Sequence, residues 1–288
     1  SVEGGTLNHA DVTINGEASG SGSLIPVTDG ALNVTGGAIS LAHTGTGATA
    51  GVRAVTLSNS DGSFASCTVS LTTGMSGNSD FATTVYQQGG DVTVNDTEIS
   101  FQSENLKTPG SGALCVTGGG EVTVEGSELT ALYQNDEPAI AVFIGTQKGT
   151  DTANILVSSI TGALIVYGEA TTNGGDFGFI QNQGTLTMFG GLVSSPGYYG
   201  IQTSGAADLS HVTIEADIGI YCTGGLSTLR DGVMITASQY GVQGRAALIG
   251  APWISGDTAD LYISSEYASP TYPSVDATQY TGDAILSV

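Results

Sequence analysis

A repeat of about 30 residues most constrains what this chain can fold into. The segment Asp91-Val-Thr-Val-Asn-Asp-Thr-Glu-Ile-Ser100 is followed 30 positions later by Glu121-Val-Thr-Val-Glu-Gly-Ser-Glu-Leu-Thr130, and two glycines precede each segment. A related segment, residues 31–40, lies 60 positions before the first. A unit of this size buries little apolar surface alone, so it is stable only when it is stacked on its neighbours. The sequence therefore predicts an architecture of stacked repeats.

One apolar residue marks the same position in successive units, and the spacing of these markers defines the repeat. The markers are Ile14, Ile39, Val69, Ile99, Leu129, Ile160, Val193, Ile214, Ile235 and Ile254. Around them, short runs alternate apolar and polar residues, and Gly, Asn, Asp or Ser separates the runs, as expected for strands joined by turns. A propeller blade needs ~40 residues, which is more than these units contain. We therefore predict an all-β parallel β-helix (solenoid) of about ten coils with three short strands per coil.

The coil motifs resemble those of a known group of proteins. The motif Gly-Gly-x-(Ile/Val/Leu)-x-(Ser/Thr) recurs together with Tyr199-Gly-Ile, Ile218-Gly-Ile and Tyr240-Gly-Val. Over residues 4–265 this is similar to bacterial cell-surface proteins with a right-handed parallel β-helix, the pertactin-like and adhesin-like proteins, whose fold the pectin-lyase-like enzymes share. The resemblance implies a right-handed helix, an extracellular or bacterial cell-surface location, and recognition of polysaccharide or of a host-surface glycan or protein. These motifs specify coils, so they do not specify an activity.

The coil pattern covers residues 1–265 without a visible domain boundary. The segment Glu266-Tyr-Ala-Ser-Pro-Thr-Tyr-Pro-Ser-Val275 is rich in proline and tyrosine and breaks the pattern. The open end of a stack of strands must be protected from pairing with other chains. We therefore expect residues 1–265 to form the β-helix and residues 266–288 to form a C-terminal cap or a linker.

The charge of the chain excludes several classes of partner. Lys and Arg number 5 against 27 Asp and Glu, which gives a formal charge of −22 at pH 7. Five basic residues cannot neutralise a phosphate backbone, so nucleic-acid binding is excluded. An anionic membrane surface would repel the chain. Since no run of ~18 apolar residues occurs, we also expect no membrane insertion in this segment.

Most of the motifs that carry catalysis in enzymes of this fold are missing here. Polygalacturonase-like enzymes carry Asn-x-Asp, Asp-Asp, Gly-His-Gly and Arg-x-Lys motifs, and the last three do not occur in this chain. Pectate-lyase-like enzymes need a basic residue to remove a proton, but the few basic residues do not cluster in one phase of the repeat. The sequence favours a non-catalytic, adhesin-like protein. A polysaccharide lyase or glycoside hydrolase with a non-standard carboxylate site is the alternative, and a structural spacer or a phage tailspike fragment are further ones.

The earlier coils are longer than the later ones, and the extra residues fall between the second and third strand of each coil. These insertions are residues 43–51, 73–80, 101–112, 131–138 and 161–175. Because they share one phase of consecutive coils, we expect them to stack as loops along one edge, where repeat proteins commonly bind ligands. A mixture of aromatic and acidic side chains suits sugar recognition. The candidate ligand-binding residues are Asp80, Phe101, Glu104, Tyr133, Asp136, Glu137 and Asp176.

Two pairs of carboxylates recur at equal phase of the repeat. Asp91 and Glu121 form one pair, and Glu98 and Glu128 form the other. Strands in adjacent coils lie ~4.8 Å apart, so each pair is close enough to repel unless water or a cation intervenes. Oxygen-rich ligand sets suit Ca²⁺, which makes calcium the one cofactor that this sequence suggests. No EF-hand spacing is present, so the two pairs are the whole basis of this hypothesis.

Overall fold

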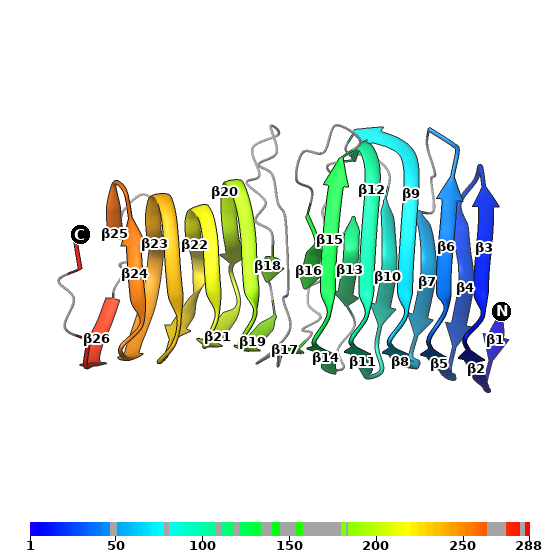
Figure 1. The fold of residues 1–288 in the computed structure, drawn as a ribbon, viewed down its shortest axis with the longest axis horizontal. Helices are drawn as coiled ribbons and strands as arrows, with labels where there is room; N and C mark the ends of the chain where they lie inside the picture. The colour runs from blue at the N-terminus through cyan, green and yellow to red at the C-terminus, as the bar shows by residue number, and fades with distance from the viewer. Residues whose placement is uncertain are drawn as a thin grey trace.

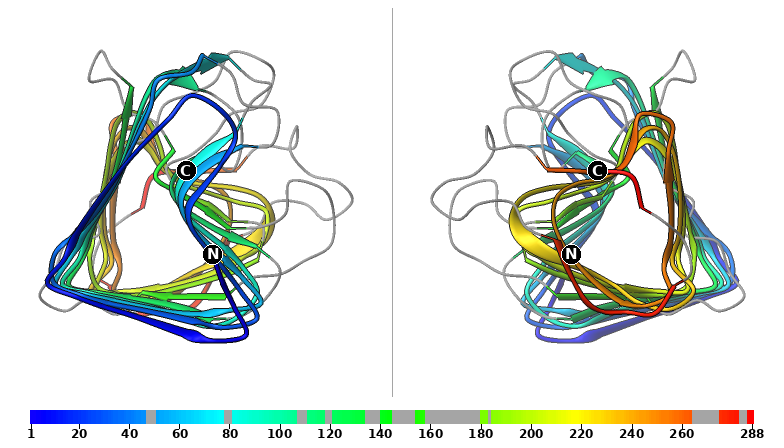
Figure 2. Two further views of the ribbon diagram at one scale, coloured as in Figure 1. Left: turned by 90° about the vertical axis from the view of Figure 1, so that its right-hand side faces the viewer. Right: turned by 90° about the vertical axis from the view of Figure 1, so that its left-hand side faces the viewer.

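The computed structural model shows an all-β molecule built from stacked parallel strands (Figure 1). It describes residues 1–46, 51–77, 81–106, 111–117, 121–133, 140–144, 154–157, 180–182, 184–263, 275–282 and 286–288. No helix occurs within these ranges, and every strand pairing recorded in them is parallel. Seen along the stack, the strands outline a roughly triangular cross-section, and the two termini lie at opposite ends (Figures 1 and 2).

The first side of the triangle, here called ladder one, contains the Val-x-Val runs of the repeat. Its pairings carry Val94 between Phe64 and Val124, and Val34 lies beyond Phe64. Its strands are β2 (Thr6–Ala10), β5 (Ala31–Thr35), β8 (Asp61–Ala65), β11 (Val92–Asn95), β14 (Glu121–Glu125), β17 (Asn154–Val157), β19 (Thr185–Phe189), β21 (Ala206–Ser210), the last parts of β22 (Thr213–Leu229) and β23 (Met234–Gly250), and β26 (Val275–Tyr280).

The second side, ladder two, contains the marker residues. Ile99 pairs with Val69 and Leu129, Ile39 pairs with Ile14 and Val69, and Ile235 pairs with Ile214 and Ile254. The predicted register is confirmed at each of these pairs, while Ile160 lies outside the described residues. The strands are β3 (Thr13–Ala18), β6 (Ala38–His43), β9 (Thr68–Gly77), β12 (Glu98–Leu106), β15 (Glu128–Tyr133), the first parts of β20 (Leu192–Thr203), β22 and β23, and β24 (Trp253–Gly256).

The third side, ladder three, completes each turn of the chain around the column, and one such turn is called a rung below. Its strands are β1 (Val2–Glu3), β4 (Gly22–Thr28), β7 (Val52–Ser58), β10 (Ala82–Gln88), β13 (Gly112–Thr117), β16 (Val142–Ile144), β18 (Ile180–Asn182), the later part of β20, the middle parts of β22 and β23, and β25 (Ala259–Tyr262). β22 and β23 therefore each pass through all three ladders within one rung.

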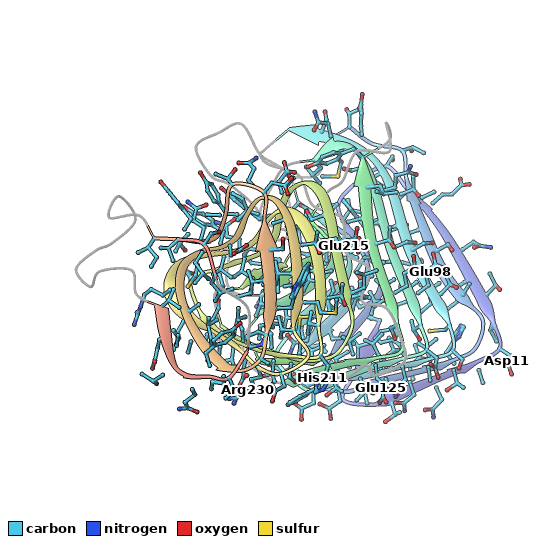
Figure 3. All side chains as sticks on the ribbon, turned by 60° about the vertical axis from the view of Figure 1, so that its left-hand side comes forward. Asp11, Glu98, Glu125, His211, Glu215 and Arg230 are labelled. Atoms are coloured by element: carbon cyan, nitrogen blue, oxygen red, sulfur yellow. The ribbon has the colours of Figure 1, made fainter. Side chains whose placement is uncertain are left out.

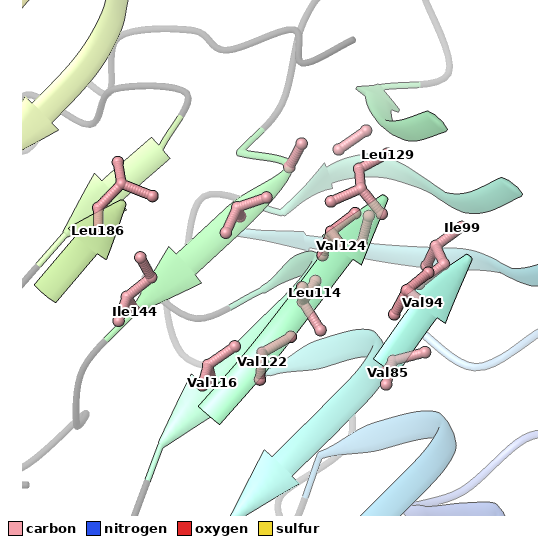
Figure 4. Packing of buried hydrophobic residues seen from close by; sticks show 14 of the residues in the cluster. Val85, Val94, Ile99, Leu114, Val116, Val122, Val124, Leu129, Ile144 and Leu186 are labelled. Carbon is pink, nitrogen blue, oxygen red and sulfur yellow. The ribbon is translucent and has the colours of Figure 1, made fainter. Parts of the chain in front are cut away.

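The three ladders enclose one apolar interior. Val94, Ile99 and Leu114 come from different ladders, are each at most 1% exposed, and belong to the same core cluster (Figure 4). Alternation along each strand sends every second side chain inward, and the parallel register then stacks these side chains rung upon rung. Removing apolar surface from water stabilises the fold by about 25 cal/mol per Å². The core is thus a continuous column rather than a central cluster.

The recurring Tyr-Gly-Ile motif has a packing explanation in ladder three. A Cβ atom at Gly219 would overlap with the side chain of Ile235, the marker of the next rung. A Cβ at Gly200 would likewise lie 2.6 Å from Cγ2 of Ile214. The preceding residue packs outside the core cluster: Tyr199 stacks on Tyr221, with ring centroids 4.7 Å apart. Glycine is therefore required at this position because the neighbouring rung occupies the space.

The described parts of the C-terminal segment remain on the stack. β26 pairs with the last part of β23, and the Leu261 amide donates to the Ser287 carbonyl at 3.0 Å. The Asp260 carboxylate accepts hydrogen bonds from the Ser287 amide (2.8 Å) and hydroxyl (3.0 Å). Leu286 packs against the core cluster. These contacts add the described parts of residues 266–288 to the end of the column.

Candidate functional site

The sequence-predicted loop edge is described only in part. Asp80, Asp136, Glu137 and Asp176 lie outside the described residues. Phe101 and Tyr133 are 2% and 3% exposed and belong to the core cluster. Glu104 is exposed on β12. Because the two rings are buried, they offer no face to a sugar in this structure, and ligand binding at this edge stays a prediction.

Phe101 and Tyr133 differ from expectation because their strands continue further than the sequence suggested. We expected loops to begin near residues 73, 101 and 131, yet β9 runs to Gly77, β12 to Leu106 and β15 to Tyr133. The alternation of inward and outward side chains continues along these extensions to Met75 and Ser103, and Phe101 follows it. After a register shift between Ser103 and Asn105, Leu106 also turns inward, so Met75, Phe101 and Leu106 join the core cluster. Figure 1 shows β9 bending over the upper edge of the stack.

The Glu98–Glu128 pair lies as the repeat predicts, in direct register on β12 and β15. Both side chains are exposed and line a hollow of about 300 Å³ together with Ser100, Gln102 and Thr130. The Thr130 hydroxyl donates to Glu128 Oε1 at 3.2 Å. Within the described residues, no three acidic, histidine or cysteine side chains gather as metal ligands require. Calcium binding therefore stays a prediction.

The other predicted pair is placed only through its backbone. Val92 pairs with Val122, so Asp91 and Glu121 precede equivalent positions of neighbouring strands. The Asp91 amide donates to Asp61 Oδ1 at 3.0 Å, which connects it to the rung before. The side chain of Glu121 lies outside what the structure describes. The carboxylate–carboxylate contact of this pair is therefore untested.

A larger hollow, which we call the C-terminal groove, lies at the far end of ladder two. Its volume is about 420 Å³. The marker residues Val193, Ile214 and Ile235 are buried, so alternation places the following residues on the outer surface. The lining residues are Ser194, Glu215, Ala216, Asp217, Thr236, Ala237, Ser238 and Asp257.

A row of small residues crosses the C-terminal groove. Ala216 pairs in register with Ser195 and Ala237, and Ala237 pairs with Gly256. Two members of this row, Ala216 and Ala237, line the groove. The Ser238 hydroxyl donates to Asp217 Oδ1, and the Asp257 amide donates to the Ala237 carbonyl at 3.1 Å. These bonds fix the acidic end of the groove.

The C-terminal groove has an acidic lining. Glu215, Asp217 and Asp257 line it, and none of its lining residues is basic. Arg230 is engaged in ladder one, where its Nε and Nη2 donate to the two carboxylate oxygens of Asp208 at 2.6 and 2.8 Å and raise the pKa of the guanidinium. Figure 3 shows Arg230 well separated from Glu215. The groove thus presents acceptor-rich chemistry without a neutralising cation.

Sequence reasoning did not single out the most exposed apolar pair beside this groove. Met234 and Trp253 pair in register on β23 and β24 and are 49% and 45% exposed. Each directly precedes a marker isoleucine, so alternation alone predicts an outward side chain. This alternation is the only sequence signal for the pair, which lies on the short coils, whereas the predicted candidates lie on or beside the long insertions.

Comparison with known proteins identifies no relative: no family model, no curated protein and no solved structure matches the chain. In the part of the chain that the structure describes, no helix has the length and apolar character needed to span a membrane.

Proposed function

We propose that this chain is a non-catalytic, adhesin-like glycan-binding module with the C-terminal groove as its binding site. The proposal includes a right-handed parallel β-helix of about ten coils and an extracellular or bacterial cell-surface location. The observation that carries the proposal is the acceptor-rich hollow of about 420 Å³ on the outside of a rigid stack. A stack of strands presents such a hollow at fixed geometry, which lowers the entropy lost on binding.

The lining of the groove suits the hydroxyl groups of a sugar. Carboxylates of Glu215, Asp217 and Asp257 accept hydrogen bonds, while the hydroxyls of Ser194 and Thr236 both donate and accept. Hydrogen bonds to charged groups contribute about 1.5–3 kcal/mol, which is more than neutral pairs contribute. Sugar hydroxyls can satisfy both kinds of group at once.

A glycoside hydrolase is the second candidate, because several carboxylates share one groove. Hydrolysis of a glycosidic bond needs one carboxyl group as acid and a second as base or nucleophile. Glu215, Asp217 and Asp257 supply the required groups. Release of reducing ends from a bound glycan, abolished in Asp217→Asn, would favour this alternative over simple binding.

A glycan array tests the proposed function directly. The purified protein is applied in the presence of calcium and again with a chelator. We expect specific binding that is lost in the double variant Asp217→Asn/Asp257→Asn and kept in Glu125→Gln, which changes an exposed carboxylate on ladder one. Loss of binding with chelator in the unmodified protein would instead point to the Glu98–Glu128 hollow.

The negative outcome is equally informative. Absence of binding to every glycan on the array would overturn the proposal and favour a structural spacer or a protein-binding adhesin. Retained binding in the double variant would move the site away from the C-terminal groove and favour the candidates predicted from the sequence, among them Asp136 and Glu137.

A further inference from the structure

We infer that Met234 and Trp253 form a stacking platform for a sugar ring and that the ligand is an uncharged glycan. This inference rests on the proposed function and names the class of glycan. It is carried by the position of two exposed apolar side chains beside the C-terminal groove.

The platform and the groove belong to one surface. Trp253 pairs with Met234, and the residue two positions beyond Met234 on the same strand is Thr236, which lines the groove. Residues two apart on a strand point to the same side and lie ~6.6 Å apart along it. Adjacent strands are ~4.8 Å apart, so Trp253 lies one strand beyond Met234. A sugar ring on the platform therefore lies next to the groove.

Backbone amide hydrogen bonds hold Trp253 and the turn before it against the preceding rung. Its amide donates to the Val233 carbonyl at 2.8 Å. The Ala251 amide donates to Asp231 Oδ1 at 2.7 Å, which connects the preceding turn to the rung before. The indole is thus presented from an ordered strand, although 45% of its surface is exposed.

The chemistry of the two features selects the ligand. An indole face buries large apolar area against the C–H face of a pyranose ring, while the neighbouring hydroxyls and carboxylates bind its hydroxyl groups. Glu215, Asp217 and Asp257 would repel the carboxylate of a uronic acid or a sulfate ester, and the whole chain carries a charge of −22. An aromatic platform beside uncompensated carboxylates therefore fits a neutral polysaccharide.

The intrinsic fluorescence of Trp253 reports on ligand binding at the platform, because Trp253 is the only tryptophan in the chain. Tryptophan fluorescence is measured while soluble oligosaccharides of glucose, mannose, xylose or galactose are added, with polygalacturonate as the acidic comparison. We expect a saturable change in emission with at least one neutral oligosaccharide and none with polygalacturonate.

Calorimetry on variants separates stacking from general binding. Trp253→Ala should weaken binding of that oligosaccharide about tenfold or more, equivalent to about 1.4 kcal/mol, and Trp253→Phe should retain part of the affinity. Met234→Ala should cause a smaller loss. Phe189→Ala is the matched control, since Phe189 is also 45% exposed but lies on ladder one, and it should leave affinity unchanged.

The outcomes distinguish this inference from the function on which it rests. Unchanged fluorescence and unchanged affinity in Trp253→Ala, with a positive glycan array, would overturn the platform but keep glycan binding. Binding of polygalacturonate at the groove would overturn the restriction to uncharged ligands. An array without any bound glycan would overturn both.

Discussion

Individual residues in this molecule are selected mainly by the rung beside them. Gly219 is small because Ile235 fills the adjacent space, and Ala216 belongs to a row of small residues that crosses the C-terminal groove. The neighbouring rung also affects the titratable side chain of His43. It is 3% exposed, its Nδ1 lies 3.0 Å from the Thr73 hydroxyl of the next rung, and burial lowers the pKa of its imidazole.

Burial of His43 predicts a loss of stability in acid. The unfolded chain takes up the proton near the ordinary pKa of 6.5, whereas the folded protein takes it up only at lower pH. The free energy of unfolding should therefore be highest above pH 6.5 and fall as pH decreases below it, by up to about 1.4 kcal/mol per pH unit. Urea unfolding between pH 5 and 7.5 measures this slope.

His43→Gln should reduce that slope, because glutamine does not titrate. The control is His211→Asn, which changes an exposed histidine at a turn position with φ of 56° that asparagine tolerates. An equal slope in His43→Gln and the unmodified protein would show that other groups cause the acid sensitivity.

At the level of single residues, the sequence predicted those positions that obey the repeat and missed those whose setting depends on strand length. Glu98 and Glu128 were placed correctly because the 30-residue spacing fixes their register. Phe101 was expected in a loop, but it lies in β12, which continues past the marker Ile99. In a polar, glycine-rich chain, the residues of such a strand extension look like loop residues. Trp253 directly precedes the marker Ile254, so alternation predicts its outward position, but nothing in the sequence marks it as a binding residue.

At some positions the backbones of neighbouring rungs lie so close together that only glycine fits. A Cβ atom at Gly225 would overlap with the carbonyl group of Gly205 in the preceding rung, whereas a Cβ at the neighbouring Gly224 would lie 3.6 Å from the Ser204 carbonyl oxygen. Both glycines are in β22, and Leu226 directly after them pairs with Ala206. Two adjacent glycines thus have different roles in the same strand.

This difference gives a matched pair of variants. Gly225→Ala should destabilise the protein by about 2 kcal/mol or more, since backbone must move to make room. Gly224→Ala should change the free energy of unfolding by less than about 0.5 kcal/mol, since its Cβ meets only an ordinary contact. Chemical unfolding of both variants checks the prediction, and equal effects would contradict the close approach at Gly225.

At the level of elements, the repeat predicted the strand register of ladders one and two, but it did not predict where the strands that lead toward ladder three end. The marker residues pair as expected wherever they are described, because a period shared by neighbouring coils leaves one register that keeps the apolar side inward. The ends of β9 and β12 were not predicted, because Thr73 and Ser103 are buried polar residues that resemble loop residues in a sequence. Buried hydroxyls that bond to local backbone explain this: Ser103 Oγ accepts from the Leu106 amide at 3.1 Å.

Over the whole molecule, charge and core act against each other. The chain carries a net charge of −22, and the carboxylates repel one another over the surface, while one apolar column runs through the interior. Salt screens exposed charges beyond about 10 Å at 0.1 M ionic strength and leaves the buried column unaffected.

Stability should therefore rise with ionic strength. Between about 0.01 and 0.5 M sodium chloride, we expect the free energy of unfolding to increase by on the order of 1 kcal/mol, because self-repulsion in the compact state is reduced. Thermal unfolding over this series measures the effect, and potassium chloride serves as the control for a sodium-specific effect. A midpoint that falls with either salt would contradict a dominant role of repulsion.

The parallel pairing of successive rungs also has a mechanical consequence. The termini lie at opposite ends of the stack, and the strands run across its long axis, so the hydrogen bonds between rungs point along that axis (Figure 1). Tension applied between the two ends would load these bonds one rung at a time, as in opening a zipper, instead of shearing many at once. The molecule would lengthen by peeling single turns from an end, so that a sudden pull is converted into a series of small extensions while the remaining turns stay folded.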